Sequence, residues 1–172
     1  MRMLYLAAGS VAVVLALGGC AGESTPPLEL AQGLSFCIPN PDSKTAIIGI
    51  DVHNTSGESI TITNAYVEGQ SKLTNGKAWL VRSLDGSRVL AAQAGIAPFT
   101  SLAGWADRRP IGKAALGAGK YTNVAVSMTF PAGYTRGSSA NGIGVNYRMQ
   151  DGTKFTGSSN VTANIVFAKD GC

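Results

Sequence analysis

The sequence predicts an all-β domain folded as a two-sheet antiparallel sandwich, Ig-like in the loose architectural sense. From Leu34 onward, apolar residues alternate with polar ones, which is the period of strands with one buried face. Gly, Asn, Asp and Ser interrupt the alternation at short intervals, as turns between antiparallel strands require. No helical period follows the N-terminal segment. The pattern yields about seven to nine strands, so a sandwich with Greek-key connections is expected, and a closed barrel is the main alternative.

The first strong strand pattern covers residues 45–54. Its two faces carry Ala46, Ile48, Ile50 and Val52 on one side and Ile47, Gly49, Asp51 and His53 on the other. A polar turn follows, and residues 60–68 return as a second strand. The apolar phase slips near Asn64, so that Ala65 and Val67 rejoin the buried face. We expect a β-bulge at this point.

The middle of the chain is expected to hold a hairpin and then a long crossing loop. Strands at 77–84 and 87–91 are joined by Asp85-Gly86, a dipeptide suited to a type I′ turn. Residues 92–120 lack a sustained period, and loops of this length usually change sheets or carry a function. The candidate binding surface is formed by the prominent side chains of this loop, namely Trp105, Asp107, Arg108 and Arg109. The alternative is that the tryptophan caps an open end of the core while the charged groups face water.

Strand periodicity resumes after this loop. Residues 121–130 place one apolar face inward, formed by Thr122, Val124, Val126, Met128 and Phe130. A hairpin turn at Asp151-Gly152 separates an alternating run at 143–149 from a return strand that begins at Lys154. Residues 161–167 supply the last inward row, so the expected strands reach almost to the end of the sequence.

The N-terminal segment has the order of a signal peptide. Arg2 is followed by apolar and small residues from Met3 to Leu17, a run shorter than the roughly 20 residues that cross a bilayer. The run ends in Leu17-Gly18-Gly19-Cys20, which resembles the lipobox of bacterial lipoproteins. This resemblance implies cleavage before Cys20 and a diacylglycerol on its thiol, which would hold the protein at the extracytoplasmic face of the bacterial cytoplasmic membrane. An ordinary secretory signal that contains a cysteine is the alternative.

Three parts make up the expected domain organisation. Residues 1–19 are the lipoprotein signal peptide, residues 20–33 are the lipidated N-terminus and a flexible tether, and residues 34–172 are the β-sandwich domain. The polar, proline-bearing composition after Cys20 argues against packing of the tether. The formal net charge of +4 is small and dispersed, so nucleic acid is not an expected partner.

The cysteine count gives a further expectation. The sequence holds three cysteines, and assigning Cys20 to lipid leaves Cys37 and Cys172 as an even pair. Extracytoplasmic compartments permit disulfides, and a bond between these two would tie the start of the domain to its last residue. The alternative is a pair of free thiols, because sequence alone does not show that the two Cα atoms come within bridging distance.

Catalytic chemistry finds little support in this sequence. His53 is the single histidine, and Asp51 lies on the same strand face, so an envelope hydrolase that uses acidic residues and His53 is an alternative function. No G-x-S-x-G or S-x-x-K motif accompanies this pair. The ligand sets of zinc and blue-copper sites are also missing from the sequence. We therefore expect no enzymatic activity, no cofactor and no metal.

The mature chain also resembles the small uncharacterised lipoproteins of actinobacterial envelopes. The resemblance rests on strand patterns, which are Ala46-Ile47-Ile48-Gly49-Ile50-Asp51-Val52-His53-Asn54-Thr55-Ser56, Ile60-Thr61-Ile62-Thr63 and Gly144-Val145-Asn146-Tyr147-Arg148. It implies the fold and the location and carries no activity. The leading hypothesis is a lipid-anchored binding or scaffolding module whose partner is an envelope protein or a polysaccharide. A purely structural or antigenic surface protein is the remaining alternative.

Overall fold

The computed structural model describes residues 26–39, 45–70, 72–82, 92–96, 104–112, 115–131 and 138–166. Strands dominate this part of the chain, together with one 3-10 turn, η2 (Trp105–Asp107). The strands are β1 (Leu28–Leu30), β2 (Ser35–Pro39), β3 (Thr45–Asn54), β4 (Ile60–Glu68), β5 (Thr74–Val81), β6 (Ala92–Ile96), β7 (Arg109–Pro110), β8 (Ala115–Leu116), β9 (Tyr121–Thr129), β10 (Ser138–Ala140), β11 (Gly142–Arg148), β12 (Lys154–Ser158) and β13 (Thr162–Val166). Within the described residues, no helix is long and apolar enough to cross a membrane.

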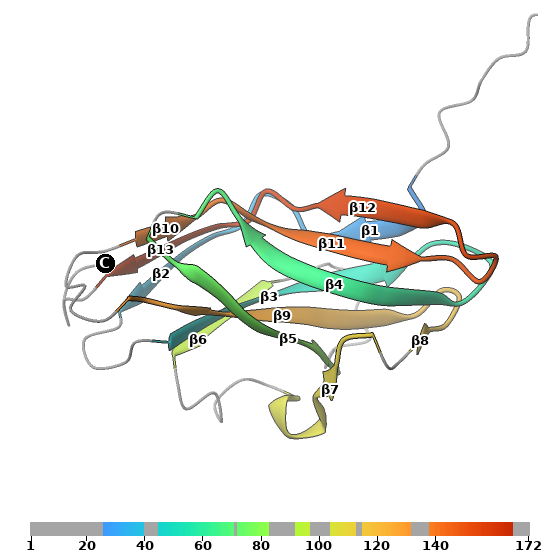
Figure 1. The fold of residues 1–172 in the computed structure, drawn as a ribbon, viewed down its shortest axis with the longest axis horizontal. Helices are drawn as coiled ribbons and strands as arrows, with labels where there is room; N and C mark the ends of the chain where they lie inside the picture. Colours follow the sequence, from blue (N-terminus) through green and yellow to red (C-terminus); the bar gives the residue numbers. More distant parts are fainter. Residues whose placement is uncertain are drawn as a thin grey trace, which may run out of the picture.

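These strands form three sheets. The largest has the order β1-β3-β9-β5-β7, with β6 also paired to β3, and the second has the order β12-β11-β4-β8. Figure 1 shows these two sheets as layers that run along the long axis, with the small sheet β10-β13-β2 at one end. The all-β fold with antiparallel sheets is confirmed. One pairing departs from the prediction, because β13 runs parallel to β2.

The core lies between the β3-β9-β5 layer and the β11-β4 layer. On β3, the predicted inward row is fully buried, and the inward row of β9 packs against the same cluster. Both rows belong to one continuous set of buried side chains that also includes residues of β4 and β11. Each fully buried Val, Ile or Met side chain contributes about 1.5–3 kcal/mol relative to exposure. Burial of these alternating apolar side chains is therefore the main source of the stability of the domain.

The predicted bulge in β4 is present. The pairing between β11 and β4 shifts register between Asn146 and Tyr147, whose partners are Asn64 and Ile62. Thr63 is the extra residue between these partners, and it keeps a hydrogen bond from its hydroxyl to the Asn146 carbonyl at 3.1 Å. The shift returns the apolar residues on both sides of the bulge to the buried face.

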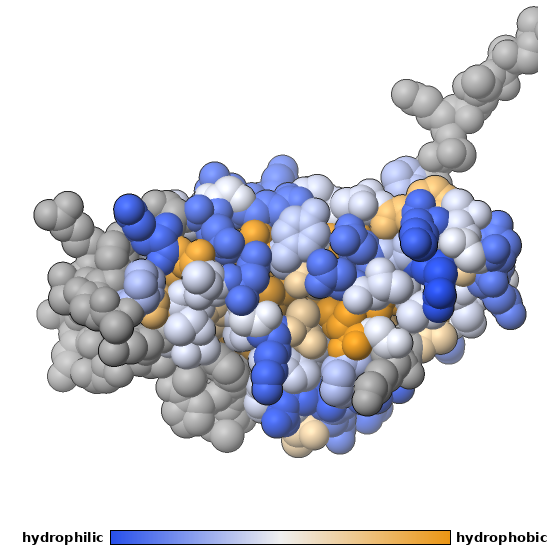
Figure 2. All heavy atoms as spheres, in the orientation of Figure 1, coloured by the Kyte–Doolittle hydropathy of each residue, from blue (hydrophilic) through white to orange (hydrophobic). Residues whose placement is uncertain are grey.

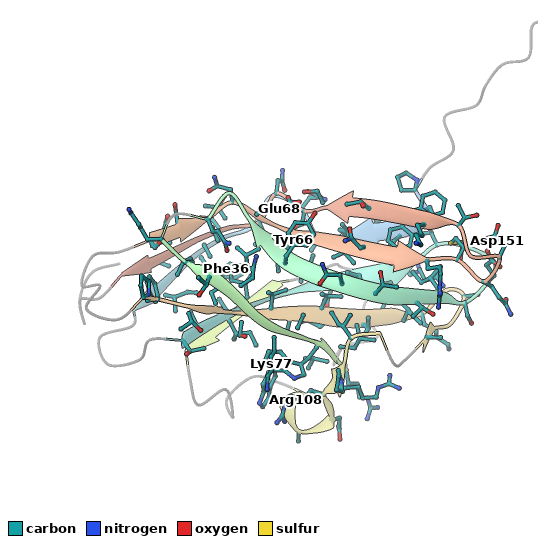
Figure 3. All side chains as sticks on the ribbon, in the orientation of Figure 1. Phe36, Tyr66, Glu68, Lys77, Arg108 and Asp151 are labelled. Carbon is teal, nitrogen blue, oxygen red and sulfur yellow. The ribbon has the colours of Figure 1, made fainter. Side chains whose placement is uncertain are left out.

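The predicted hairpin turn between β11 and β12 is confirmed. Gly152 adopts a positive φ of 92°, which a glycine tolerates without steric strain. The Asp151 carboxylate accepts hydrogen bonds from the Thr153 backbone N–H at 2.8 Å and from its hydroxyl at 2.9 Å. These bonds lower the pKa of Asp151, because they favour the ionised carboxylate. Figure 3 shows Asp151 at the tip of this hairpin.

Two expectations need correction. Residues 28–30 were assigned to the flexible tether, but they form β1, which pairs with β3, and Leu28, Leu30 and Ala31 are buried. A three-residue strand is too short to show a period, which is why the sequence pattern missed it. The segment 92–120 is also more ordered than a loop, since it contains β6, η2, β7 and β8. The predicted turn at Asp85-Gly86 and the strand at 87–91 lie outside the described residues.

Candidate functional site

The crossing segment, residues 104–112 and 115–120, carries the chain from one sheet to the other. It begins beside β5, where Leu80 pairs with Arg109. Next, the Gly112 N–H donates to the Ile62 carbonyl of β4 at 2.9 Å, and Leu116 pairs with Ile60. The segment therefore covers part of the open side between β5 and β4. A change of sheet was one of the two roles expected of a long connection at this position.

Asn54 holds the far end of the crossing segment in place. This residue is fully buried at the end of β3. Its Nδ2 lies within hydrogen-bonding distance of the carbonyl oxygens of Glu58 at 2.8 Å, Leu116 at 2.9 Å and Gly117 at 3.0 Å. Its Oδ1 accepts from the backbone N–H and the hydroxyl of Ser56. One buried amide thus fixes two neighbouring loops, as a satisfied buried polar group can.

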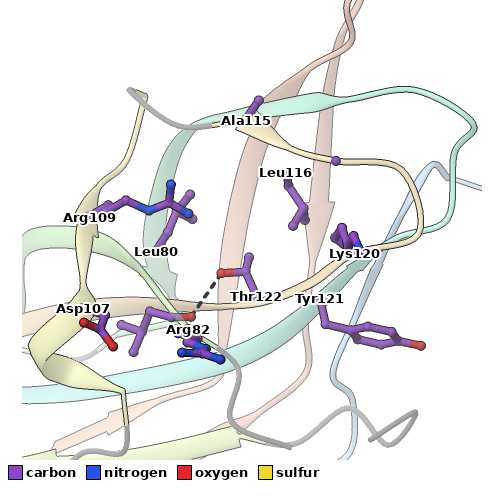
Figure 4. Close-up of a pocket in the computed structure, with 11 residues that line it drawn as sticks. Leu80, Arg82, Asp107, Arg109, Ala115, Leu116, Lys120, Tyr121 and Thr122 are labelled. Atoms are coloured by element: carbon purple, nitrogen blue, oxygen red, sulfur yellow. Dashed lines mark hydrogen bonds between the residues drawn. The ribbon is translucent and has the colours of Figure 1, made fainter. Parts of the chain in front are cut away.

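A cavity of about 580 Å³ lies between the end of β5, the crossing segment and the start of β9. We call it the crossing pocket. Its inner wall includes three buried side chains, namely Leu80, Leu116 and Thr122. The Thr122 hydroxyl donates to the Val81 carbonyl at 3.1 Å, so it is already satisfied within the protein. Figure 4 shows these side chains between the flanking elements.

Charged side chains surround the crossing pocket. Arg82 follows β5, Arg109 lies in β7, and Lys120 immediately precedes β9. Figure 4 shows Arg109 and Lys120 on opposite sides of the cavity. Asp107 is the single acidic residue among the lining side chains. In the described part of the chain, none of these four groups forms an ion pair within 4.0 Å. The three cations therefore leave the pocket with a net positive charge that suits an anionic ligand.

The four residues of the predicted binding surface divide into two pairs. Asp107 and Arg109 line the crossing pocket. Trp105 is instead packed against Trp79, with ring centroids 5.0 Å apart at an interplanar angle of 70°. Arg108 lies over the Trp105 ring, with its guanidinium carbon 4.7 Å from the ring centroid, and donates to the Trp105 carbonyl at 3.0 Å. Figure 3 shows Arg108 at the 3-10 turn of the crossing segment, below β5 in this view.

The Trp79 and Trp105 pair covers the outer face of the large sheet. Both rings pack against a small cluster formed by Ile47, Val81 and Ala125, which point away from the main core. The capping alternative placed Trp105 over an open end of the core. In the structure, Trp105 covers the outer face of the large sheet instead. An edge-to-face aromatic pair contributes about 0.5–1.5 kcal/mol beyond the burial of its surface.

Two cations of the pocket, Arg82 and Lys120, were missed by the sequence reasoning. They lie far apart in the sequence and line one cavity because β5 pairs with β9, with Val81 opposite Asn123. In the sequence, each of them is only a charged residue next to a predicted strand. Such residues are common at turns, so this feature does not indicate a binding site. The adjacency of β5 and β9 is a property of the topology, which the local pattern does not specify.

The side chains of Asp51 and His53, which share a strand face, each contact other residues. His53 Nδ1 lies 3.3 Å from Glu29 Oε2, and the His53 ring stacks on Tyr121 at a centroid distance of 4.0 Å. Asp51 accepts a hydrogen bond from the Asn123 amide at 3.2 Å. The two side chains thus turn to different neighbours on the outer face of the sheet, and the carboxylate partner of the histidine is Glu29.

The remaining predicted sites fall largely outside the described residues. Cys37 lies in β2 and is disulfide-bonded. Cys20 and Cys172 are outside the described ranges, so lipidation and the pairing of Cys37 with Cys172 stay predictions. Among the described residues, no group of three or more His, Cys, Asp or Glu side chains could hold a metal ion.

A second hollow lies on the open side of the sandwich. Figure 2 shows a mostly polar face, with apolar surface between β4 and the end of β5. A cavity of about 500 Å³ there is lined by residues of β4, β5 and the crossing segment, including Thr63, Ala78 and Ile111. Lys77 is the one charged residue of this lining. This hollow therefore lacks the converging charges of the crossing pocket.

Comparisons with known proteins place the chain in no family. No family model matches the sequence, and no curated protein matches it. Among solved structures, the chain is similar to PapD-like (ASH) domain 7 of human CEP192, at 12% sequence identity and a TM-score of 0.39. That similarity covers 96% of this chain and 100% of the other.

Proposed function

We propose that this chain is a lipid-anchored, extracytoplasmic binding protein of the bacterial cell envelope, built on a β-sandwich of the loose Ig-like kind. Its binding site is the crossing pocket. The observation that carries the proposal is the convergence of Arg82, Arg109 and Lys120 from three separate elements on one cavity. Like charges that line one cavity oppose one another, so an anionic ligand in the cavity would favour this arrangement.

The lipobox supports the anchored part of the proposal. Seven positions after Cys20, Pro27 already belongs to the folded domain, because its carbonyl accepts a hydrogen bond from the Thr55 N–H. Mass analysis of the mature N-terminus tests this part directly. We expect a chain that begins at Cys20 with a diacylglycerol on its sulfur. A chain that begins at Met1, or an unmodified Cys20, would overturn the anchor.

Site-specific photo-crosslinking in intact cells tests the binding part. A crosslinking amino acid at Ala115, an exposed residue that lines the crossing pocket, is compared with the same group at Thr156. Thr156 is exposed on β12, away from this pocket. We expect an adduct at position 115 that position 156 does not give, and that Arg109→Gln reduces. Equal labelling at both positions would show that the pocket is not the binding site.

A further inference from the structure

The crossing pocket lies at the end of the domain where the chain enters it. The Thr55 N–H donates to the Pro27 carbonyl at 2.9 Å, and the adjacent Asn54 N–H donates to the Lys120 carbonyl at 3.0 Å. Gly119 returns a hydrogen bond to the Asn54 carbonyl at 2.9 Å. The first described residues and the rim of the pocket are therefore joined through two consecutive residues, Asn54 and Thr55.

The length of chain between Cys20 and this end is short. Position 26, the first described residue, lies six residue steps beyond position 20, with five residues between them. An extended chain spans at most about 3.3–3.6 Å per residue, so this connection reaches roughly 21 Å at most. If Cys20 carries the lipid, the end of the domain that bears the crossing pocket stays close to the membrane surface.

The other charges at this end of the domain are of both signs. Arg148 lies opposite Thr61, and Thr61 in turn lies opposite Ala115 of β8. Arg148 and Ala115 line a shallow neighbouring cavity. The exposed Arg148 thus lies next to the pocket on the other sheet, and the exposed Asp151 lines the same neighbouring cavity. The positive charge available to a ligand is therefore that of the crossing pocket itself.

The chemistry of the pocket fits an amphipathic anion. Arginine forks bind phosphate through paired hydrogen bonds, and lysine adds a point charge. The buried Leu80 and Leu116 side chains offer apolar surface beside these cations. A phospholipid presents the same combination, since its phosphate lies next to the start of its acyl chains. Anionic membrane surfaces also attract basic clusters held close to them.

We infer that the crossing pocket binds the phosphate group of an anionic phospholipid in the membrane that anchors the protein. This inference rests on the proposed function and names the ligand of that site. With the lipid on Cys20 as one attachment and the pocket as a second, the domain takes one orientation on the membrane. Because the lipid on Cys20 already holds the protein at the membrane, the pocket is exposed to a high local concentration of phospholipid.

Vesicle flotation tests the inference. The chain from residue 20 onward, carrying Cys20→Ser, is mixed with phosphatidylcholine vesicles that contain or lack about one-third phosphatidylglycerol. We expect binding to the anionic vesicles only, and weaker binding as salt rises. The double variant Arg109→Gln/Lys120→Gln should bind about 25-fold more weakly, which is about fivefold for each lost cation.

A matched double variant controls for charge. Arg108→Gln/Lys77→Gln removes the same charge from residues that do not line the crossing pocket, and it should bind within about threefold of the parent chain if the pocket provides the contact. Thermal melts confirm that both variants are folded. Equal loss in the two variants would overturn the inference, because general electrostatic attraction would then explain vesicle binding.

Soluble probes separate this inference from the proposed function. Inorganic phosphate and glycerol 1-phosphate are titrated into the same variants. If these anions bind through Arg109 and Lys120 while the vesicles do not bind, the membrane inference is wrong and the proposed binding function stands. If neither probe nor vesicle distinguishes the pocket variant, and the Ala115 crosslink is also unspecific, both proposals fail.

Discussion

The side-chain amide of Asn54 donates to the backbone carbonyl of Leu116 across 2.9 Å, and this bond ties the end of β3 to β8 in the opposite sheet. The same amide nitrogen reaches the carbonyls of Glu58 and Gly117. The shape of the crossing pocket therefore depends on a residue that does not line it.

Replacing Asn54 should destabilise the domain strongly. In Asn54→Ala, the buried Leu116 carbonyl would lose this donor, and the Glu58 and Gly117 carbonyls would keep only their bonds from Ser56 and Lys120. A buried group left unsatisfied costs about 1–3 kcal/mol. We expect a loss of about 3 kcal/mol in the free energy of unfolding, measured by urea denaturation. Asn164→Ala serves as the control, because Asn164 is exposed on β13. Similar losses in the two variants would argue against the role assigned to Asn54.

Two glycines should respond differently to alanine. A Cβ added to Gly142 would overlap the carbonyl oxygen of Ser159, whereas a Cβ on Gly57 would meet no atom within 4 Å. Gly142→Ala should lower stability by about 1–3 kcal/mol, because backbone atoms must shift. Gly57→Ala should be neutral or slightly stabilising, because it restricts the unfolded chain. The denaturation midpoints of both variants are compared with that of the parent protein. A neutral Gly142→Ala would contradict the close approach of Gly142 to the Ser159 carbonyl.

Alkaline pH should destabilise the protein through Tyr147. Burial raises the pKa of this phenol above its usual value near 10, and a smaller hydrogen-bond effect from the Leu28 backbone acts in the opposite direction. The unfolded chain ionises first as pH rises, so the contribution of Tyr147 to stability is constant below about pH 10 and is lost above it. Tyr147→Phe should reduce this fall. The free energy of unfolding of the parent protein and of Tyr147→Phe is measured between about pH 8 and 11. A parallel fall in the two proteins would contradict the prediction.

Replacing Trp105 should lower the stability of the domain without changing its binding to vesicles. Trp105→Ala removes half-buried surface and the contact with Trp79, so we expect a loss of about 2 kcal/mol, or roughly 4–8 °C in Tm. Arg108→Ala removes an exposed cation–π contact and should cost about 0.5–1 kcal/mol. Folded Trp105→Ala protein should keep its vesicle affinity. A loss of affinity at unchanged Tm would instead place Trp105 in the binding site.

The sequence pattern predicted what depends on local period and turn chemistry. The faces of β3 and β9, the bulge in β4 and the hairpin turn at Asp151-Gly152 all follow from residues close together in the chain. The crossing pocket depends on which strands become neighbours. Arg82 and Lys120 meet only because β5 lies beside β9, and the strand order arises from packing between distant segments. For the same reason, the parallel partner of β2 was not expected.

The parallel pairing of β2 with β13 also constrains the order in which the protein can fold. Ser35 pairs with Thr162, and Ile38 pairs with Ile165, so an early strand of the described residues is completed by the last strand among them. During synthesis, β2 lacks this partner until residues 162–166 have emerged. Contacts between such distant segments form slowly, and exposed edges invite pairing with other chains in the meantime. Truncation within β13 would therefore leave that edge uncovered permanently.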